Sequence, residues 1–167
     1  MDDMRTSGRG RDSDLAAKEK TLRALTAAVG AVFLLVGILG FIPGITTNYD
    51  TMTFAGHEGN AKLLGVFEVS VLHNIVHLLF GVVGLWAARA ARTAVPYLIG
   101  GGVIYLLLWI YGLVIDYDDS ANFIPVNDAD NWLHLVLGVA MVLIGAVGAR
   151  MIAPGRTGTA DRTRNRR

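Results

Sequence analysis

Two asparagine–histidine pairs lie inside segments of the sequence that are otherwise apolar. Asn74 and His77 are three residues apart, and Asn131 and His134 have the same spacing. Such side chains are rare in hydrocarbon, because a polar group without a partner there costs several kcal/mol. The pairs therefore predict either hydrogen bonds between helices or a polar site that helices enclose.

Helical spacing predicts that each pair shares its face with small residues. Residues three or four positions apart lie on one face of a helix, and the predicted helix-packing glycines fall at such positions: Gly81, Gly84, Gly138 and Gly145. Small and polar residues together are typical of helix–helix contacts in lipid. We predict that the two faces point at one another or at a shared cavity. The candidate polar site comprises Asn74, His77, Asn131, His134 and His73.

A metal or haem site is a second interpretation of the same residues. His77 and His134 are its weak candidate ligands, since each has a glycine four residues later that leaves room for a flat ring. His73 can pair with His77 on one metal, but no third ligand is evident. The chain has no cysteine, which excludes thiolate metal sites and iron–sulfur clusters. Hydrogen bonding between helices explains the residues more simply, so no cofactor is expected.

Catalysis is not indicated by the other polar residues. No Ser/His/Asp arrangement suited to a nucleophile is evident, and the glycines at 100–102 are not followed by the Lys-Ser/Thr of a phosphate loop. Asn131 also has a structural explanation, because with Asp128 and Asp130 it lies where the N-cap of a helix is expected. Nucleic-acid binding has no support beyond an arginine-rich C-terminal segment.

The elements that must position these residues are predicted to be four membrane-spanning helices. The chain has 167 residues, of which 53% are hydrophobic and 17% are charged. The charged residues leave four long uncharged runs, at 24–49, 69–88, 93–115 and 131–149. About 20 apolar residues cross a hydrocarbon core of about 30 Å as a helix. We predict an all-α transmembrane four-helix bundle over residues 21–152, with spans at about 22–42, 64–88, 94–115 and 131–152.

The charge distribution predicts how the bundle is oriented. Of 15 Lys and Arg residues, only Lys62 lies in the loops where acidic residues gather. Because Lys and Arg are retained in the cytoplasm, we expect a multi-pass protein of the cytoplasmic membrane with both termini cytoplasmic. Polar composition predicts disordered tails at 1–20 and 153–167. The expected partners are the lipid bilayer and, through helix contacts, further copies of the chain or other membrane proteins.

An internal repeat relates the two halves of the chain. The pattern Asn-x-x-His-Leu-x-x-Gly occurs at 74–81 and at 131–138, and upstream Gly-x-x-Phe/Tyr-Leu-Leu occurs at 30–35 and at 102–107. Each copy contains two spans, so both copies insert in the same orientation, related by a pseudo-twofold axis along the membrane normal. The predicted bundle is therefore made of two repeated helical hairpins.

Several short motifs resemble one protein family. They are Phe41-Ile42-Pro43-Gly44, Tyr49-Asp50 with Phe54-Ala55-Gly56-His57-Glu58, Leu72-His73-Asn74-x-x-His77, Tyr97-Leu98-Ile99-Gly100-Gly101 and Asp130-Asn131-Trp132-Leu133-His134. Over about residues 24–150 the sequence resembles an actinobacterial family of integral membrane proteins, catalogued as domain of unknown function 4383. The resemblance implies a four-span membrane protein without supplying an activity, substrate or cofactor. The family often has glutamine at the position of Glu68, which argues against carboxylate chemistry there.

The sequence favours a non-enzymatic role that is structural, envelope-associated or sensing. At a rise of 1.5 Å per residue, His77 and His134 lie about 18 and 24 Å from the cytoplasmic arginines, so the polar site is expected in the outer half of the bundle. Two alternatives stay open. One is a haem- or metal-binding redox protein that uses His77 and His134, and the other is a small-molecule or proton pathway.

Overall fold

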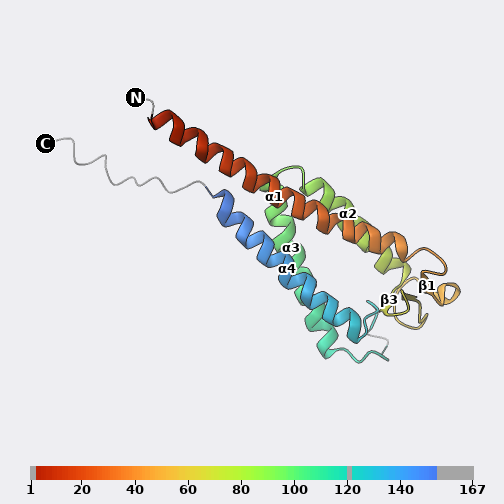
Figure 1. The fold of residues 1–167 in the computed structure, drawn as a ribbon. Coiled ribbons are helices and arrows are strands. Elements are labelled where there is room, and N and C mark those ends of the chain that lie inside the picture. The colour runs from red at the N-terminus through yellow and green to blue at the C-terminus, as the bar shows by residue number, and fades with distance from the viewer. Residues whose placement is uncertain (1–2, 120–121, 154–167) are drawn as a thin grey trace.

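The molecule is a bundle of helices with a small sheet at one end (Figure 1). The computed structural model describes residues 3–119 and 122–153. In this part of the chain the helices are α1 (Asp3–Leu39), α2 (Val71–Ala87), α3 (Ala91–Val114) and α4 (Asp128–Ile152). The predicted all-α bundle is confirmed. The apolar runs did not predict the short elements between α1 and α2, which are β1 (Thr46–Thr47), the 3-10 helix η1 (Tyr49–Thr51), β2 (Lys62–Leu63) and β3 (Phe67–Glu68).

The helices expose apolar side chains and bury polar ones. Many large apolar side chains face outward, among them those of Leu35, Leu79, Leu107 and Val136. The buried residues include several polar ones: Thr26, Asn74, His77, Asn131 and His134. A water-soluble bundle has the opposite distribution. The residues Gly10–Leu39 of α1, together with α3 and α4, form three helices that are each long and apolar enough to cross a membrane, and α2 is apolar but shorter. The chain is therefore a membrane protein.

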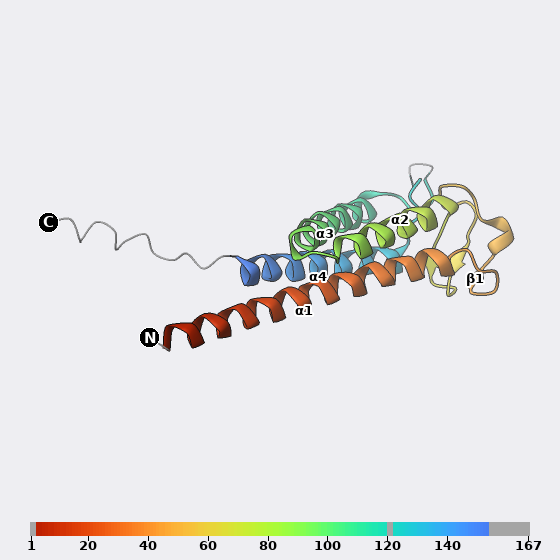
Figure 2. The ribbon, with the colours of Figure 1, turned by 90° about the horizontal axis from the view of Figure 1, so that it is seen from above.

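The helices associate mainly in two antiparallel pairs. α1 packs along α2, and α3 packs along α4, whereas the contacts between the two pairs are less extensive. Figures 1 and 2 show the strands and the starts of α2 and α4 at one end of the bundle, with the start of α1 and the end of α4 at the other. We call the pair α1–α2 the first hairpin and the pair α3–α4 the second hairpin.

The first helix begins much earlier than the sequence predicts. Residues 1–20 were expected to form a disordered tail, but α1 is helical from Asp3 onward and is exposed from Gly10 to Thr21. The residues from Leu15 to Lys20 are mostly good helix formers. A helix that the membrane segment has already nucleated also extends at little cost. Of the other predicted tail, residues 154–167 lie outside the described part of the chain.

The second helix begins later than predicted. The span was expected from about residue 64, whereas α2 starts at Val71 and Ser70 is its N-cap. The Oγ of Ser70 accepts a hydrogen bond of 3.1 Å from the backbone N–H of His73, which fixes the start of the helix. Leu64 and Gly65 before it have positive φ angles of 55° and 72°, which are incompatible with an α-helix. The segment therefore turns and forms β3 instead.

The fourth helix begins at Asp128, a few residues before the predicted start. Its N-cap is Asn127, so the expectation that Asn131 occupies this position is wrong. Asn127 and Asp130 form a capping box, in which each side chain accepts a hydrogen bond from the other residue's backbone N–H, at 3.0 and 3.2 Å. Reciprocal capping satisfies two backbone donors at once, which explains why the helix starts at this position.

The short strands form an antiparallel sheet in the order β1-β2-β3. Thr46 is opposite Leu63, and Lys62 is opposite Glu68. Beneath the sheet, Ala61, Leu63 and Val69 form a small buried cluster against Val36 and Leu39 of α1. The sheet is thus attached to the end of the first hairpin, above the start of α2.

Candidate functional site

Three histidines and a tyrosine from three different helices meet between the hairpins. His73 and His77 lie on α2, Tyr105 on α3 and His134 on α4. The ring centroids of His73 and His77 are 4.1 Å apart, and the ring of Tyr105 lies 6.4 Å from His77 and 5.3 Å from His134. We call these four residues the histidine cluster. Tyr105, His77 and His134 are 2%, 8% and 5% exposed, so the cluster is an interior feature of the bundle.

Hydrogen bonds order most of the histidine cluster. The Nδ1 of His77 lies 3.0 Å from the backbone oxygen of His73, and its Nε2 lies 3.2 Å from the hydroxyl of Tyr105. The Nδ1 of His73 lies 3.4 Å from the Oδ1 of Asn74. His134 differs, because its Nδ1 is buried and has no hydrogen-bond partner in the described part of the chain.

The two asparagines lie against glycines within their own hairpins. A Cβ atom at Gly40 would collide with the side-chain amide of Asn74, and one at Gly112 would collide with that of Asn131. The Nδ2 of Asn74 donates to the Sδ of Met52 at 3.8 Å, whereas the Oδ1 of Asn131 is buried without a partner among the described residues. The structure therefore gathers the predicted histidines between the hairpins and places the predicted asparagines inside them.

The predicted packing glycines are all buried where two helices approach closely. A Cβ at Gly81 would lie 2.8 Å from the backbone oxygen of Gly30, and a Cβ at Gly138 would lie 3.0 Å from that of Gly102. Gly84 and Gly145 are equally confined, with Gly30 and Ile99 as close neighbours. Larger residues at these positions would force the helices apart.

Two cavities share the histidine cluster. One, of about 260 Å³, lies on the side of α2 and α3 and is also lined by Val76, Ile104 and the loop residues Phe123, Ile124 and Pro125. The other, of about 240 Å³, lies on the side of α1 and α4 and is also lined by Phe33, Phe67 and Asp130. All four cluster residues line both cavities. The cluster therefore forms a polar wall between two largely apolar spaces.

The described residues offer few ligands to a metal. Among them, no group of three or more His, Asp, Glu or Cys side chains lies close enough together to hold a metal ion. Both ring nitrogens of His77 already have partners, and Tyr105 contacts the rings of both His77 and His134. A metal or haem bound by His77 and His134 would have to displace these contacts.

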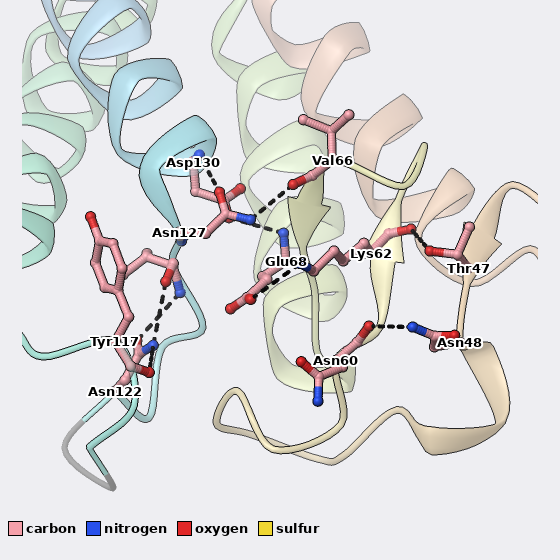
Figure 3. A network of polar contacts seen from close by, with 11 residues as sticks. Thr47, Asn48, Asn60, Lys62, Val66, Glu68, Tyr117, Asn122, Asn127 and Asp130 are labelled. Carbon is pink, nitrogen blue, oxygen red and sulfur yellow. Dashed lines mark hydrogen bonds and ion pairs between the residues drawn. The ribbon is translucent and has the colours of Figure 1, made fainter.

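A second polar network joins the strands to the start of α4 (Figure 3). The Oδ2 of Asp130 accepts a hydrogen bond of 2.9 Å from the backbone N–H of Glu68, and the Nδ2 of Asn127 donates to the backbone oxygen of Val66 at 2.8 Å. We call these four residues the clasp. Nearby, the backbone N–H of Gly56 donates to the oxygen of Phe123 at 2.8 Å. The clasp thus joins the segment between α1 and α2 to the start of α4, and its Asp130 also lines the second cavity.

Glu68 carries a charge at the edge of this network. Its carboxylate lies 3.9 Å from the ammonium group of Lys62, and its side chain is largely shielded, at 15% exposure. Burial raises the pKa of Glu68 above its ordinary value, and the positive charge of Lys62 offsets only part of this increase. The Glu68 carboxylate therefore belongs to an ion pair beside the clasp and lies outside the histidine cluster.

Residues 23–147 match the model of the family described as a domain of unknown function (DUF4383). The matched region contains the histidine cluster, the clasp and most of the bundle. The chain belongs to this family. No curated protein and no solved structure matches it.

In this DUF4383 chain, two functional residues are not predicted from the sequence: Tyr105 as a member of the histidine cluster and Asp130 as a member of the clasp. Tyr105 stands at the position that Phe33 occupies in the other copy of the proposed repeat, and its hydroxyl is a polar group in an apolar run. This difference between the two copies of the repeat is the feature of the sequence that could have identified Tyr105 as a functional residue. Asp130 was interpreted only through its proximity to a helix N-terminus, because its partner Glu68 lies far away in the sequence.

Proposed function

We propose that this protein binds a lipophilic small molecule at the histidine cluster and does so without catalysing a reaction. The observation that carries the proposal is the arrangement of two largely apolar cavities around four shared polar side chains. Ligand sites in proteins are typically apolar spaces with a few convergent polar groups that orient the ligand. A sensing or envelope-associated role is consistent with such binding.

Access from the bilayer supports a lipophilic ligand. Val76 and Ile104, which line the first cavity, are 39% and 45% exposed on the apolar surface of the bundle. Val32 and Leu35 of the second cavity are 49% and 54% exposed. A molecule dissolved in the acyl chains can therefore reach the cluster sideways between the two hairpins, without first crossing water.

The proposal includes the membrane arrangement inferred from the sequence. We propose that α2 also crosses the membrane, as the fourth span, and that the hairpins are repeats related by a pseudo-twofold axis. The position of nearly all Lys and Arg residues supports cytoplasmic termini in the cytoplasmic membrane. This topology would place the histidine cluster in the outer half of the bilayer, with the strands and the clasp facing outward.

Binding without chemistry agrees with the residues around the cluster. Asp130 is the carboxylate that the described residues contribute to the second cavity. It is occupied by the backbone N–H groups of Glu68 and Asn127, which leaves it poorly placed to act as a base for a neighbouring histidine. A nucleophile activated by a histidine would need such a triad-like partner.

Photolabelling tests the proposal directly. The full chain in proteoliposomes is labelled with a long-chain alcohol that carries a diazirine, with and without excess unlabelled alcohol, and the labelled peptides are mapped. We expect saturable labelling of α2 and α3 near Val76 and Ile104. Ile104→Trp fills the first cavity and should reduce labelling, whereas the control Val103→Trp, equally exposed at 45% but outside the cavities, should not. Labelling that does not saturate, or that both variants reduce equally, would refute the proposal.

A further inference from the structure

The hydrogen bonds of the histidine cluster restrict the kind of ligand that it can take. We infer that the ligand has an uncharged head group that both donates and accepts hydrogen bonds, as the hydroxyl of a lipophilic alcohol or phenol does. This inference rests on the proposed function, and it goes further by naming the chemistry of the ligand.

The partners of His77 decide where its proton lies. Its Nδ1 faces the backbone oxygen of His73 at 3.0 Å, and a carbonyl oxygen can only accept. The ring of a neutral imidazole then has its proton on Nδ1 and an acceptor lone pair on Nε2. The hydroxyl of Tyr105, 3.2 Å from that Nε2, must donate to it. The lone pairs of the Tyr105 oxygen are left to accept a hydrogen bond.

The partners of Asn74 decide where the proton of His73 lies. The sulfur of Met52 can only accept, so the side of Asn74 that faces it carries the amide nitrogen, and the amide oxygen faces His73. The Nδ1 of His73, 3.4 Å from that oxygen, is then the protonated nitrogen. Its Nε2 becomes a second acceptor in a ring that lines both cavities.

His134 supplies the complementary donor. Its Nδ1 is buried without a partner among the described residues. A buried N–H group without an acceptor is rarer in proteins than an acceptor that lacks a donor. We therefore assign the proton to Nε2, which makes His134, a residue that lines both cavities, the hydrogen-bond donor of the cluster.

The cluster thus offers one donor, on His134, and two acceptors, on Tyr105 and His73. A hydroxyl group matches this set because it accepts from one side and donates to the other. Neither cavity is lined by a Lys or Arg among the described residues, so an ionised carboxylate would be buried without a counter-charge. An ether or ketone can accept from His134 but cannot donate to Tyr105 or His73.

Competition against the photoreactive alcohol tests the inference. The probes are 4-nonylphenol and its methyl ether, which differ mainly in the hydrogen-bond donor. We expect the phenol to displace the label at a concentration at least about tenfold lower than the ether, because polar sites reject analogues that lack the matching group. The ratio should fall in His73→Phe, which removes an acceptor for the phenol hydroxyl, whereas His134→Phe removes a donor that both probes can use and should weaken the binding of both alike. The ratio should be unchanged in the control His57→Gln, whose side chain lines neither cavity.

The outcomes separate this inference from the proposed function. Equal displacement by the phenol and the ether would overturn the inference and leave lipophile binding intact. If no probe gives saturable labelling, both this inference and the proposed function are overturned. Nitrogen NMR of the unmodified protein, with labelled histidine imidazoles, provides a readout that does not depend on variants. We expect the Nδ1-protonated form for His77 and the Nε2-protonated form for His134, and the reverse result for His134 would refute the assigned donor.

Discussion

The contact within each hairpin differs in kind from the contact between the hairpins. Within the first hairpin, a Cβ at Gly30 would lie 2.8 Å from the backbone nitrogen of Leu85, and within the second, a Cβ at Gly102 would lie 2.8 Å from the backbone oxygen of Gly138. Between the hairpins, the ring of Tyr105 meets those of Phe33 and His77, and cavities remain on both sides of them. The bundle is thus tight within each pair of helices, and its cavities lie beside the histidine cluster between the pairs.

The contacts within the hairpins therefore govern stability, and the contacts between the hairpins govern ligand binding. Where two backbones pack directly against each other, no flexible side chain can move to relieve a clash. These contacts therefore hold the two helices of each hairpin in a fixed arrangement. The rings of Phe33 and Tyr105, with centroids 5.2 Å apart, hold the hairpins together while leaving space for a ligand. Substitutions in the first region should therefore destabilise the protein, and those in the second should mainly change binding.

The largest effect is expected from filling the close contacts within a hairpin. Gly30→Val and Gly102→Val each place a side chain against backbone atoms, which cannot move aside, and should lower the free energy of unfolding by about 3 kcal/mol. Gly100→Val is the control, since a Cβ there has no neighbour within 4 Å. Unfolding in detergent, followed by circular dichroism, measures the difference. Similar stability for all three variants would contradict the tight packing described above.

A smaller effect is expected from the clasp. Asp130→Ala leaves the N-cap bond of Asn127 in place but removes the acceptor of two backbone N–H groups, those of Asn127 and Glu68, and this loss should cost about 1–2 kcal/mol. Hydrogen exchange at the Glu68 amide should accelerate, because that amide loses its acceptor. Asp128→Ala is the matched control, since it removes an acidic residue from the same helical turn and leaves the clasp in place. Equal acceleration in both variants would show that charge near α4, and not the clasp, protects this amide.

The helices could be predicted from the sequence far better than their starts. Long uncharged runs identify membrane helices because the bilayer demands uniform apolarity over a fixed length. The start of α2 depends on the cap at Ser70, and the start of α4 depends on the reciprocal bonds of Asn127 and Asp130. These local hydrogen bonds, and not the apolar pattern, determine the residue at which each helix starts. The strands depend on pairing between residues distant in the sequence, such as Thr46 and Leu63. Helical periodicity carries no information about such pairing, so the strands could not be predicted from it.

The candidate site could be predicted only in part for a related reason. Helical spacing puts His73 and His77 on one face and Asn131 with His134 on another, but it does not say which neighbour each face meets. Asn131 meets Gly112 of α3 inside the second hairpin, whereas His134, which meets Tyr105 of the same helix, also lines the cavities shared with α2. The separation of asparagines from histidines follows from how the helices cross, which spacing along one helix cannot define.

Two tyrosines on α3 make hydrogen bonds of different kinds. The hydroxyl of Tyr97 donates to the backbone oxygen of Phe80 at 3.1 Å, and that of Tyr105 bonds to the Nε2 of His77 at 3.2 Å. Tyr97→Phe and Tyr105→Phe should each cost about 0.6 kcal/mol of stability, the average for such bonds in lipid. Only Tyr105→Phe should also shift the imidazole nitrogen signals of His77. A shift of equal size in Tyr97→Phe would argue that the histidine cluster responds to general loosening of the helices.

The smallest effect is expected from the charge on Glu68. Because the pKa of Glu68 is raised in the folded protein, the native state binds its proton more tightly than the unfolded chain does. Its contribution to stability is therefore present at pH values below the ordinary range of a glutamate, and it is lost as the pH rises through the pKa of the folded state. Glu68→Gln should remove this part of the pH dependence, measured as the unfolding midpoint between pH 4 and pH 7.

Lys62 determines the size of this last effect. Its positive charge lowers the pKa of Glu68 and so offsets part of the increase that burial causes. Lys62→Met should therefore raise that pKa further, and stability should fall more steeply with increasing pH than in the unmodified protein. In the double variant Lys62→Met/Glu68→Gln the added slope should vanish, because the titrating group is gone. An added slope that persists in the double variant would assign it to another carboxylate of the clasp region, for which Asp130 is the neighbouring candidate.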